Sequence, residues 1–273
     1  MDTKQPLKVA YGGGSIPLHY SDLTTYWECP RRWSYQRVGW RPHRLPDAML
    51  RGLLVDRGVA AAWKGQSLRV GVADEVVLQL QYINGAHPPD AADLQAKVRA
   101  LGLEAISMAG RYMQQLGVDL EPILVATTVT KDSPAGLIAG TPDCVAMHEG
   151  RRVLVELKTG QDPNPRMYRM TGQADFYAYL LGDIDLVYYD LVSPNNVMRY
   201  RRPPRKDRGE YLVKKLIALA QLTQRMPAWD AENPRYGWWC ARCPFLEACQ
   251  THDDWGDDEE VLLSTMWREE RKG

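Results

Sequence analysis

The cysteines of this chain are divided between its two ends. Cys29 is alone near the beginning, whereas Cys240, Cys243 and Cys249 follow one another near the end with the spacing C-x2-C-x5-C. Thiolates at C-x2-C spacing suit Zn²⁺ or an iron–sulfur cluster, and the spacing does not separate the two. The long stretch after Cys29 disfavours a compact zinc finger. A metal group held by all four would join the chain ends and restrict the unfolded chain strongly.

Length and composition bear on where such a group can be held. The 273 residues are enough for one large domain or two small ones. No apolar run is long enough to cross a membrane, and the first residues lack the apolar core of a signal peptide. We therefore expect a cytoplasmic protein with no membrane partner. In that reducing compartment, clustered cysteines are metal ligands more often than disulfides.

The hydrophobic pattern predicts an α/β fold, with a small mixed central sheet flanked by helices. A helix capped by Ser21 or Asp22 is expected to run through Trp33 and beyond. Further helices are predicted over residues 48–63, 91–116, 167–181 and 211–222. Strands are predicted over residues 123–130, 137–147, 152–158, 186–192 and 196–201, with a hairpin turn at 148–151.

Acidic residues meet a lysine on the predicted central hairpin. Asp143 follows Pro142, and Glu156 and Lys158 share one face of the next strand because strand residues two apart point the same way. If the hairpin pairs as drawn, Asp143 comes near Glu156. Two carboxylates at a strand end suit Mg²⁺ or Mn²⁺. The alternative is a strand-end salt bridge between Glu156 and Lys158, which the doublet alone favours and which Asp143 and the cysteines make less favourable.

The segment G-T-P-D…E-L-K-T-G resembles the core of the PD-(D/E)xK nuclease superfamily. The segment Q-A-D-F-Y, from Gln173 to Tyr177, is similar to the Q-x-x-x-Y motif of the RecB-like branch. The resemblance implies that Asp143, Glu156 and the Leu157 carbonyl bind the metal, and that Lys158 positions the nucleophile. It also implies that the Gln173–Tyr177 face contacts DNA and orients the substrate or the lysine. A packing face with a polar edge is the alternative reading of that helix.

The cysteines carry a second resemblance. The sequences around W-E-C-P and C-A-R-C-P resemble the split staple of AddB and Cas-four type nucleases. This resemblance implies a [4Fe-4S] cluster with Cys29, Cys240, Cys243 and Cys249 as ligands. Cys144 alternates with Asp143 and is expected to point into the core. The implied organisation is an irregular lead-in over 1–20, an iron–sulfur-stapled nuclease domain over 21–250, and an acidic to mixed-charge, partly helical tail over 251–273.

Some positions depart from the family pattern or allow two readings. Where the family has G-x3-H, this chain has Gly52 and Asp56, and the aspartate is either a further metal ligand or a surface residue. The basic segment, residues 199–215, either follows a phosphate backbone or is solvated. Arg31 and Arg32 are expected near the DNA backbone. Trp238 and Trp239 either stack on bases or shield the cluster.

The leading hypothesis is a metal-dependent DNA exonuclease that acts on single strands or free ends. The pathway would be recombination, repair or CRISPR-type DNA processing, with protein partners from those settings. No G-x4-G-K-S/T helicase motif occurs, which favours a stand-alone nuclease. The first alternative is a non-catalytic iron–sulfur module that binds DNA ends, and the second is a structural protein stapled by zinc.

Overall fold

The computed structural model shows two compact units. It describes residues 17–37, 40–42, 45–86, 88, 90–134, 136–161, 163–225, 237, 240–241, 243, 245–246, 249 and 266–268. Unit 1 comprises Met1–Pro46, Asp132–Ile138 and Lys214–Gly273, and unit 2 comprises Asp47–Lys131 and Ala139–Val213. Among the described residues, no helix is long and apolar enough to span a membrane.

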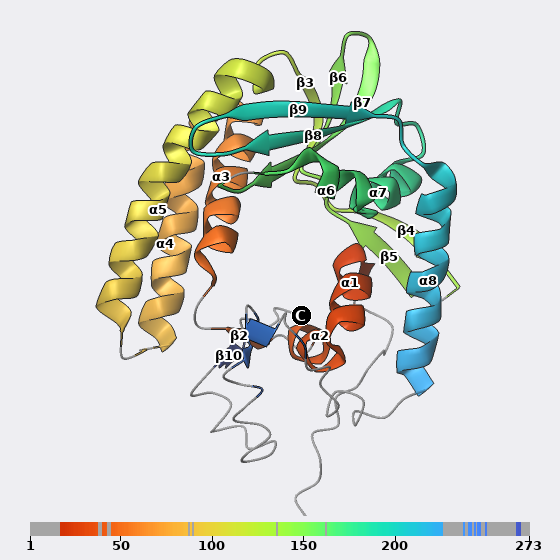
Figure 1. The fold of residues 1–273 in the computed structure, drawn as a ribbon, viewed down its shortest axis with the longest axis horizontal. Helices are drawn as coiled ribbons and strands as arrows, with labels where there is room; N and C mark the ends of the chain where they lie inside the picture. Colours follow the sequence, from red (N-terminus) through yellow and green to blue (C-terminus); the bar gives the residue numbers. More distant parts are fainter. Residues whose placement is uncertain are drawn as a thin grey trace, which may run out of the picture. The chain divides into compact units, whose positions relative to one another are not determined.

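A five-stranded sheet forms the centre of unit 2, in the order β3-β6-β7-β8-β9 (Figure 1). Its strands are β3 (Glu121–Val125), β6 (Cys144–His148), β7 (Arg151–Thr159), β8 (Leu186–Val192) and β9 (Val197–Arg202). Only β7 and β8 pair in parallel, while the other neighbours are antiparallel. A parallel pair needs a long crossover, and here the crossover contains α6 (Pro165–Met170) and α7 (Gln173–Leu181). The predicted mixed sheet with flanking helices is therefore present.

The turn between β6 and β7 is as short as the sequence indicates. Glu149 and Gly150 form it, with positive φ angles of 51° and 70°, and His148 pairs with Arg151 on either side. A two-residue turn with both φ angles positive matches the twist of the strands that it joins. The turn predicted at 148–151 is confirmed, and with it the pairing of the two strands.

Three helices of unit 2 pack against one another, namely α3 (Asp47–Trp63), α4 (Leu68–Ala86) and α5 (Ala91–Tyr112) (Figure 1). The α3 helix also contacts β7 and β3, so it joins the helical layer to the sheet. A π-helical turn, η1 (Met113–Gly117), continues α5, whereas the sequence predicts regular helix to residue 116. The α4 helix is not predicted at all.

Several predicted elements are divided in two. The strand predicted over 123–130 is β3 and β4 (Val129–Ser133), separated where Ala126 has a φ of 47°. The strand predicted over 137–147 is β5 (Gly136–Gly140) and β6, because Pro142 lies in the break and cannot donate to a sheet. The helix predicted over 167–181 is α6 and α7, separated at Thr171, whose ψ of 141° is extended.

Three arginines of the basic segment pair with two buried carboxylates. Arg202 and Arg205 bond to Asp175 with nitrogen–oxygen distances of 2.5 and 3.1 Å, and Arg199 bonds to both oxygens of Asp190 at 2.7 Å. Both aspartates are fully buried. Ion pairs of this kind hold β8, β9 and α7 together. The expectation that the whole segment follows a phosphate backbone is thus wrong for these three arginines.

Unit 1 contains α1 (Tyr20–Glu28), α2 (Pro30–Arg37) and short strands. The single helix predicted through Trp33 is wrong, because Cys29 is extended, with a φ of −157°, and ends α1. Pro30 then begins α2, a position where its missing N–H costs nothing. β2 (Trp40–Pro42) pairs with β10 (Met266–Arg268). A further sheet has the order β1 (Leu18–His19), β5, β4.

Few of the predictions for the two ends of the chain can be compared with the structure. Residues 1–16 of the expected lead-in, Trp238, Trp239 and most of the tail lie outside the described residues. In the tail, residues 266–268 form a strand, and the rest of the tail, which is expected to be partly helical, lies outside the described residues. α8 (Lys206–Arg225) begins in unit 2 and agrees with the helix predicted over 211–222.

Candidate active site

The register of the β6–β7 hairpin brings Asp143 to Glu156. Cys144, the first residue of β6, pairs with Val155 on β7, so the preceding residue faces Glu156. The Leu157 N–H donates to Asp143 Oδ2 over 2.7 Å, which fixes the carboxylate at the end of the strand. The geometry anticipated from the turn is therefore present. Cys144 itself is fully buried, as its alternation with Asp143 predicts.

Glu156 is a carboxyl group held in an unfavourable environment. Its side chain is fully buried, and among the described residues its Oε1 atom has no hydrogen-bond partner. Burial, and then the charge of Asp143, raise its pKa to about 8, although Lys158 opposes the shift. Burial also raises the pKa of Asp143, against the effects of Lys158 and the Leu157 N–H. A buried acceptor that no described residue satisfies is consistent with a place for an external cation.

Lys158 is the hub of a hydrogen-bond chain that includes both residues of the Q-x-x-x-Y motif. Its Nζ donates to Glu156 Oε2 at 3.0 Å and to Gln173 Oε1 at 3.1 Å. The Gln173 amide in turn donates to the Tyr177 hydroxyl at 3.1 Å. An ammonium group has donors only, so it fixes the Gln173 amide with its oxygen toward the lysine. The side chains of β7 and α7 are thus joined by a continuous series of hydrogen bonds.

The protonation states of this chain follow from its charges. Burial lowers the pKa of Lys158, but Glu156 and then Asp143 outweigh that effect, and the net pKa is raised. Burial and the Glu156 carboxylate raise the pKa of Tyr177. Both side chains therefore stay protonated at neutral pH. Lys158 is suited to orienting a nucleophile or offsetting negative charge rather than to removing a proton.

Asp56 approaches the same site from α3. Burial, and then the Asp143 carboxylate, raise its pKa well above the usual value, with Glu156 adding to the shift and Lys158 opposing it. A Cβ atom on Gly52 would lie 2.8 Å from Thr159 Oγ1, so a larger residue there would force the Thr159 side chain or the helix to shift. Asp56 lies one turn further along α3 and is half-buried. The influence of Asp143 and Glu156 on its pKa is consistent with the reading of Asp56 as a metal ligand, which stays a prediction.

The carboxyl groups fit a divalent cation in charge and chemistry. Asp143 and Glu156 raise the pKa of Asp56, and Asp143 raises the pKa of Glu156, while hard oxygen donors are those that Mg²⁺ and Mn²⁺ prefer. Within the described ranges, however, no three His, Cys, Asp or Glu side chains meet in a group that could hold a metal ion. The assignment thus depends on Asp143, Glu156 and the unsatisfied Oε1 atom, with Leu157 lying between Glu156 and Lys158.

We predict that Mn²⁺ raises the Tm of the wild-type protein and not that of Glu156→Gln. Saturation at 100 times Kd stabilises a folded protein by about 2.7 kcal/mol, which corresponds to several degrees here. In EDTA the variant should match the wild type or melt slightly higher, because it removes a buried group whose ionisation is opposed. Thermal unfolding with and without Mn²⁺ measures both effects. An equal Mn²⁺ shift in the two proteins would place the ion elsewhere.

The four cysteines predicted as ligands, Cys29, Cys240, Cys243 and Cys249, belong to unit 1, whereas Cys144 belongs to unit 2. Burial raises the pKa of Cys243, and the thiols of Cys29 and Cys240 add to the shift, although the Phe245 N–H lowers it. Cys29 is buried, and the five cysteines, all among the described residues, form no disulfide. Neighbouring thiols drawn from both chain ends fit a soft metal or cluster. As with the acids, the described side chains do not assemble into a group of three ligands.

Arg31 faces a cysteine rather than solvent. Its side chain is buried, with the residue 3% exposed, and its Nη1 atom lies 3.3 Å from Cys249 Sγ and 3.4 Å from the Cys249 carbonyl. A residue so covered cannot contact a DNA backbone, so that expectation is wrong for Arg31. Arg32 pairs with Glu28 at 3.0 Å, and its charge lowers the pKa of Cys243. The sequence offered one signal for this role, namely their position directly after Cys29 and Pro30.

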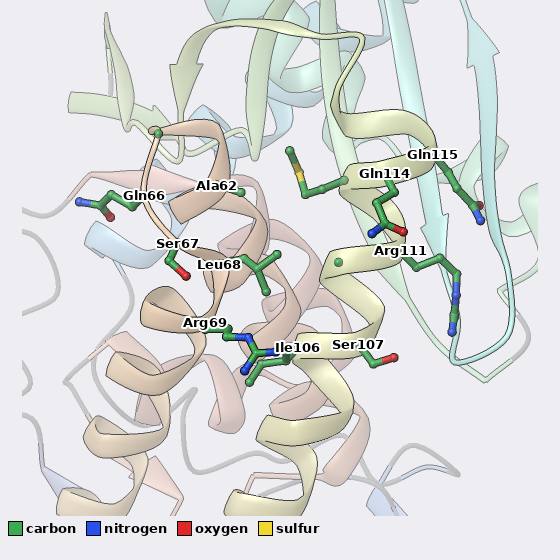
Figure 2. A pocket seen from close by; sticks show the side chains of 13 residues that line it. Ala62, Gln66, Ser67, Leu68, Arg69, Ile106, Ser107, Arg111, Gln114 and Gln115 are labelled. Atoms are coloured by element: carbon green, nitrogen blue, oxygen red, sulfur yellow. The ribbon is translucent and has the colours of Figure 1, made fainter.

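A groove of about 990 Å³ also lies in unit 2, between the α3–α4 turn and the α5–η1 end (Figure 2). Figure 2 shows its lining of amide, hydroxyl and guanidinium groups, which includes Gln66, Ser67, Arg69 and Gln114. None of the predicted site residues belongs to the lining. Arg111, at the rim, donates to the Ser193 and Pro194 carbonyls.

A strand pair that presents two carboxylates and a lysine is typical of metal-dependent nucleases. The family model of the PD-(D/E)XK nuclease superfamily matches residues 17–250. Because the match covers most of the chain, the protein belongs to that superfamily, and the mixed α/β fold agrees with it. Membership indicates a metal-dependent nuclease, and therefore a protein that binds nucleic acid.

Other comparisons are less informative. A search of curated proteins gives no match. Among solved structures, 19 chains are similar. One of them, titled "Crystal structure of SSO0001", is 16% identical, with a TM-score of 0.42 over 88% of this chain and 89% of that chain.

Proposed function

We propose that this protein is a metal-dependent DNA exonuclease of the RecB-like branch that acts on single-stranded DNA or free DNA ends. The observation that carries the proposal is the hydrogen-bond chain from Glu156 through Lys158 and Gln173 to Tyr177. It joins the D…E-x-K residues to the Q-x-x-x-Y residues, two motifs that the sequence leaves separate. The recombination, repair or CRISPR-type setting is part of the same proposal.

In this mechanism Asp143 and Glu156 hold Mg²⁺ or Mn²⁺, with the Leu157 carbonyl and Asp56 as further ligands. A divalent ion, when bound, supplies Lewis acidity toward the phosphodiester and lowers the pKa of water. The Lys158 ammonium, held by Gln173, orients the attacking water and offsets charge that develops on the phosphate. Tyr177 holds the Gln173 amide in position and remains a phenol. Because these hydrogen bonds are already formed without substrate, the Lys158 ammonium is in position before the substrate binds.

The proposal includes a [4Fe-4S] cluster bound by Cys29, Cys240, Cys243 and Cys249. Its support is the electrostatic coupling of Cys243 with Cys29 and Cys240, together with the Arg31 guanidinium at 3.3 Å from Cys249 Sγ. Hydrogen bonds to thiolate sulfur are a common means of tuning such clusters. Bound there, the cluster would connect segments from both ends of the chain and serve first as a structural element.

Labelled DNA tests the activity. Protein purified without oxygen is incubated with 5′-labelled and 3′-labelled single-stranded and duplex DNA in Mg²⁺ or Mn²⁺. We expect progressive shortening from an end, faster on single strands, and suppression by EDTA. A closed circular single strand serves as the control and should persist.

Other outcomes would change the assignment. Cleavage of the circular strand would make the protein an endonuclease and contradict the exonuclease proposal. Tight binding to DNA ends without any cleavage, by protein that retains its metal, would favour the non-catalytic binding module.

A further inference from the structure

The α6 segment, defined as residues 159–172, lies between two residues whose side chains are hydrogen-bonded to each other, Lys158 and Gln173. Thr159, the residue after Lys158, is the last residue of β7, and α7 begins at Gln173. The Lys158 and Gln173 side chains meet at 3.1 Å. The exposed side chains of this segment therefore lie near the candidate active site. Met170 is three residues from Gln173, a separation of about 11 Å at most.

Two methionines of α6 are strongly exposed. Met167 is 66% exposed and Met170 77% exposed. They are three residues apart, so they share one face of the helix. An exposed pair of flexible thioethers is unusual, because such side chains more often fill cores. Their position beside the catalytic lysine indicates contact with a ligand.

The opposite side of α6 is anchored to the sheet, so the methionines are held outward. Tyr168 stacks on Tyr189 of β8 with ring centroids 6.0 Å apart and an interplanar angle of 25°. The Thr171 hydroxyl donates to the Tyr168 carbonyl at 3.0 Å and lies 3.4 Å from the Tyr189 hydroxyl. The orientation of the short helix is thus fixed by packing rather than by its own length.

Cationic side chains border the two methionines. Arg166 is exposed and, within the described part of the chain, makes no ion pair. Arg208 donates to the Met170 carbonyl from α8. Apolar thioethers beside guanidinium groups match a ligand that has flat apolar faces and regularly spaced negative charges. An unpaired nucleic-acid strand has both, whereas a duplex hides its base faces in the stack.

From these contacts we infer that Met167 and Met170 pack against unpaired bases of the DNA strand next to the cleaved phosphate, and so select single strands over duplex. The inference rests on the proposed function and deepens it. The separation from Gln173 to Met170, about 11 Å at most, spans only a few nucleotides of a strand. Thioether sulfur makes favourable contacts with aromatic rings, and stacking of this kind tolerates any base.

Binding measurements test this inference. The wild type, Met167→Ala/Met170→Ala and Met167→Leu/Met170→Leu are titrated against labelled single-stranded and duplex DNA in EDTA, which suppresses cleavage. We expect the alanine pair to raise the Kd for single strands about tenfold, the effect of losing one or two base contacts, with little change for duplex. The leucine pair should retain most of the affinity. Leu103→Ala, which removes another exposed apolar side chain of unit 2, is the control.

A modified strand makes the test specific for bases. Removing the bases near the end of the strand should weaken binding by the wild type and leave binding by the alanine pair unchanged. Equal losses on single strands and duplex, or no loss on either, would overturn the inference even if the wild type cleaves DNA normally. If the wild type neither binds nor cleaves DNA, the proposed function itself fails and the inference falls with it.

Discussion

Lys158→Ala and Glu156→Gln are each expected to lower the rate of metal-dependent DNA cleavage by about a thousandfold or more. Removing one preorganised charge-stabilising group typically costs 10²–10³ in rate. Lys158→Ala also removes the hydrogen bond to Glu156, whereas Glu156→Gln keeps an acceptor for Lys158 and removes the negative charge. Single-turnover cleavage of end-labelled DNA at saturating Mn²⁺ measures the loss. DNA binding in EDTA should change little, because neither residue is exposed enough to supply most of the affinity.

Matched controls separate chemistry from charge loss in general. Lys131→Ala and Glu121→Gln remove a cation and a carboxylate from exposed positions of the same unit and should leave the rate within about twofold, as surface substitutions usually do. Gln173→Ala should reduce the rate by about tenfold, since Lys158 keeps its charge and loses one of its two acceptors. Rates near wild type in Lys158→Ala would refute the proposed mechanism, whatever the controls do.

The second large effect is expected at the cysteines. Cys29→Ser should yield protein with almost no iron and a much lower Tm, because the group that would tie the chain ends is lost. Closing a loop of this length restricts the unfolded chain by an amount worth several kcal/mol, about 4 or more on the crosslink scale. Iron and sulfide analysis of anaerobically purified protein, with thermal unfolding, gives both values.

Cys144→Ala is the matched control, because Cys144 is also buried but lies in the sheet of unit 2. It should keep the iron content of the wild type and lose only about 1 kcal/mol of stability from the lost sulfur. Equal iron in Cys29→Ser and the wild type would remove Cys29 from the ligand set. Zinc without iron in the wild type would instead establish a zinc staple.

The local parts of the site were predictable from the sequence. The pairing of Asp143 with Glu156 follows from one short turn, since two residues with positive φ leave little freedom in the register. Gln173 and Tyr177 share a helical face for an equally local reason. The hydrogen bond from Lys158 to Gln173 could not be predicted from the sequence. It depends on where the crossover between β7 and β8 returns to the sheet after α6.

Long-range features were predicted least well. Asp56 reaches the site only because α3 packs against β7 at Gly52, and no sequence pattern specifies that contact. The basic segment was over-interpreted, because the acids that neutralise Arg199 and Arg202 are buried elsewhere, at Asp190 and Asp175. The α4 helix was overlooked, since its apolar residues do not form a single clear face and several, such as Val77, are exposed.

The hydrogen bond between Lys158 and Gln173 allows the α6 segment to change during evolution while the candidate active site stays the same. Lys158 and Gln173 are hydrogen-bonded to each other, and Lys158 also bonds to Glu156. The segment between Lys158 and Gln173 can therefore change in sequence or length without moving these three side chains. Loops tolerate such variation at small thermodynamic cost. New substrate preferences could therefore arise in this segment by small steps while the hydrolytic centre keeps its geometry, and exchange of α6 between relatives is a direct way to transfer them.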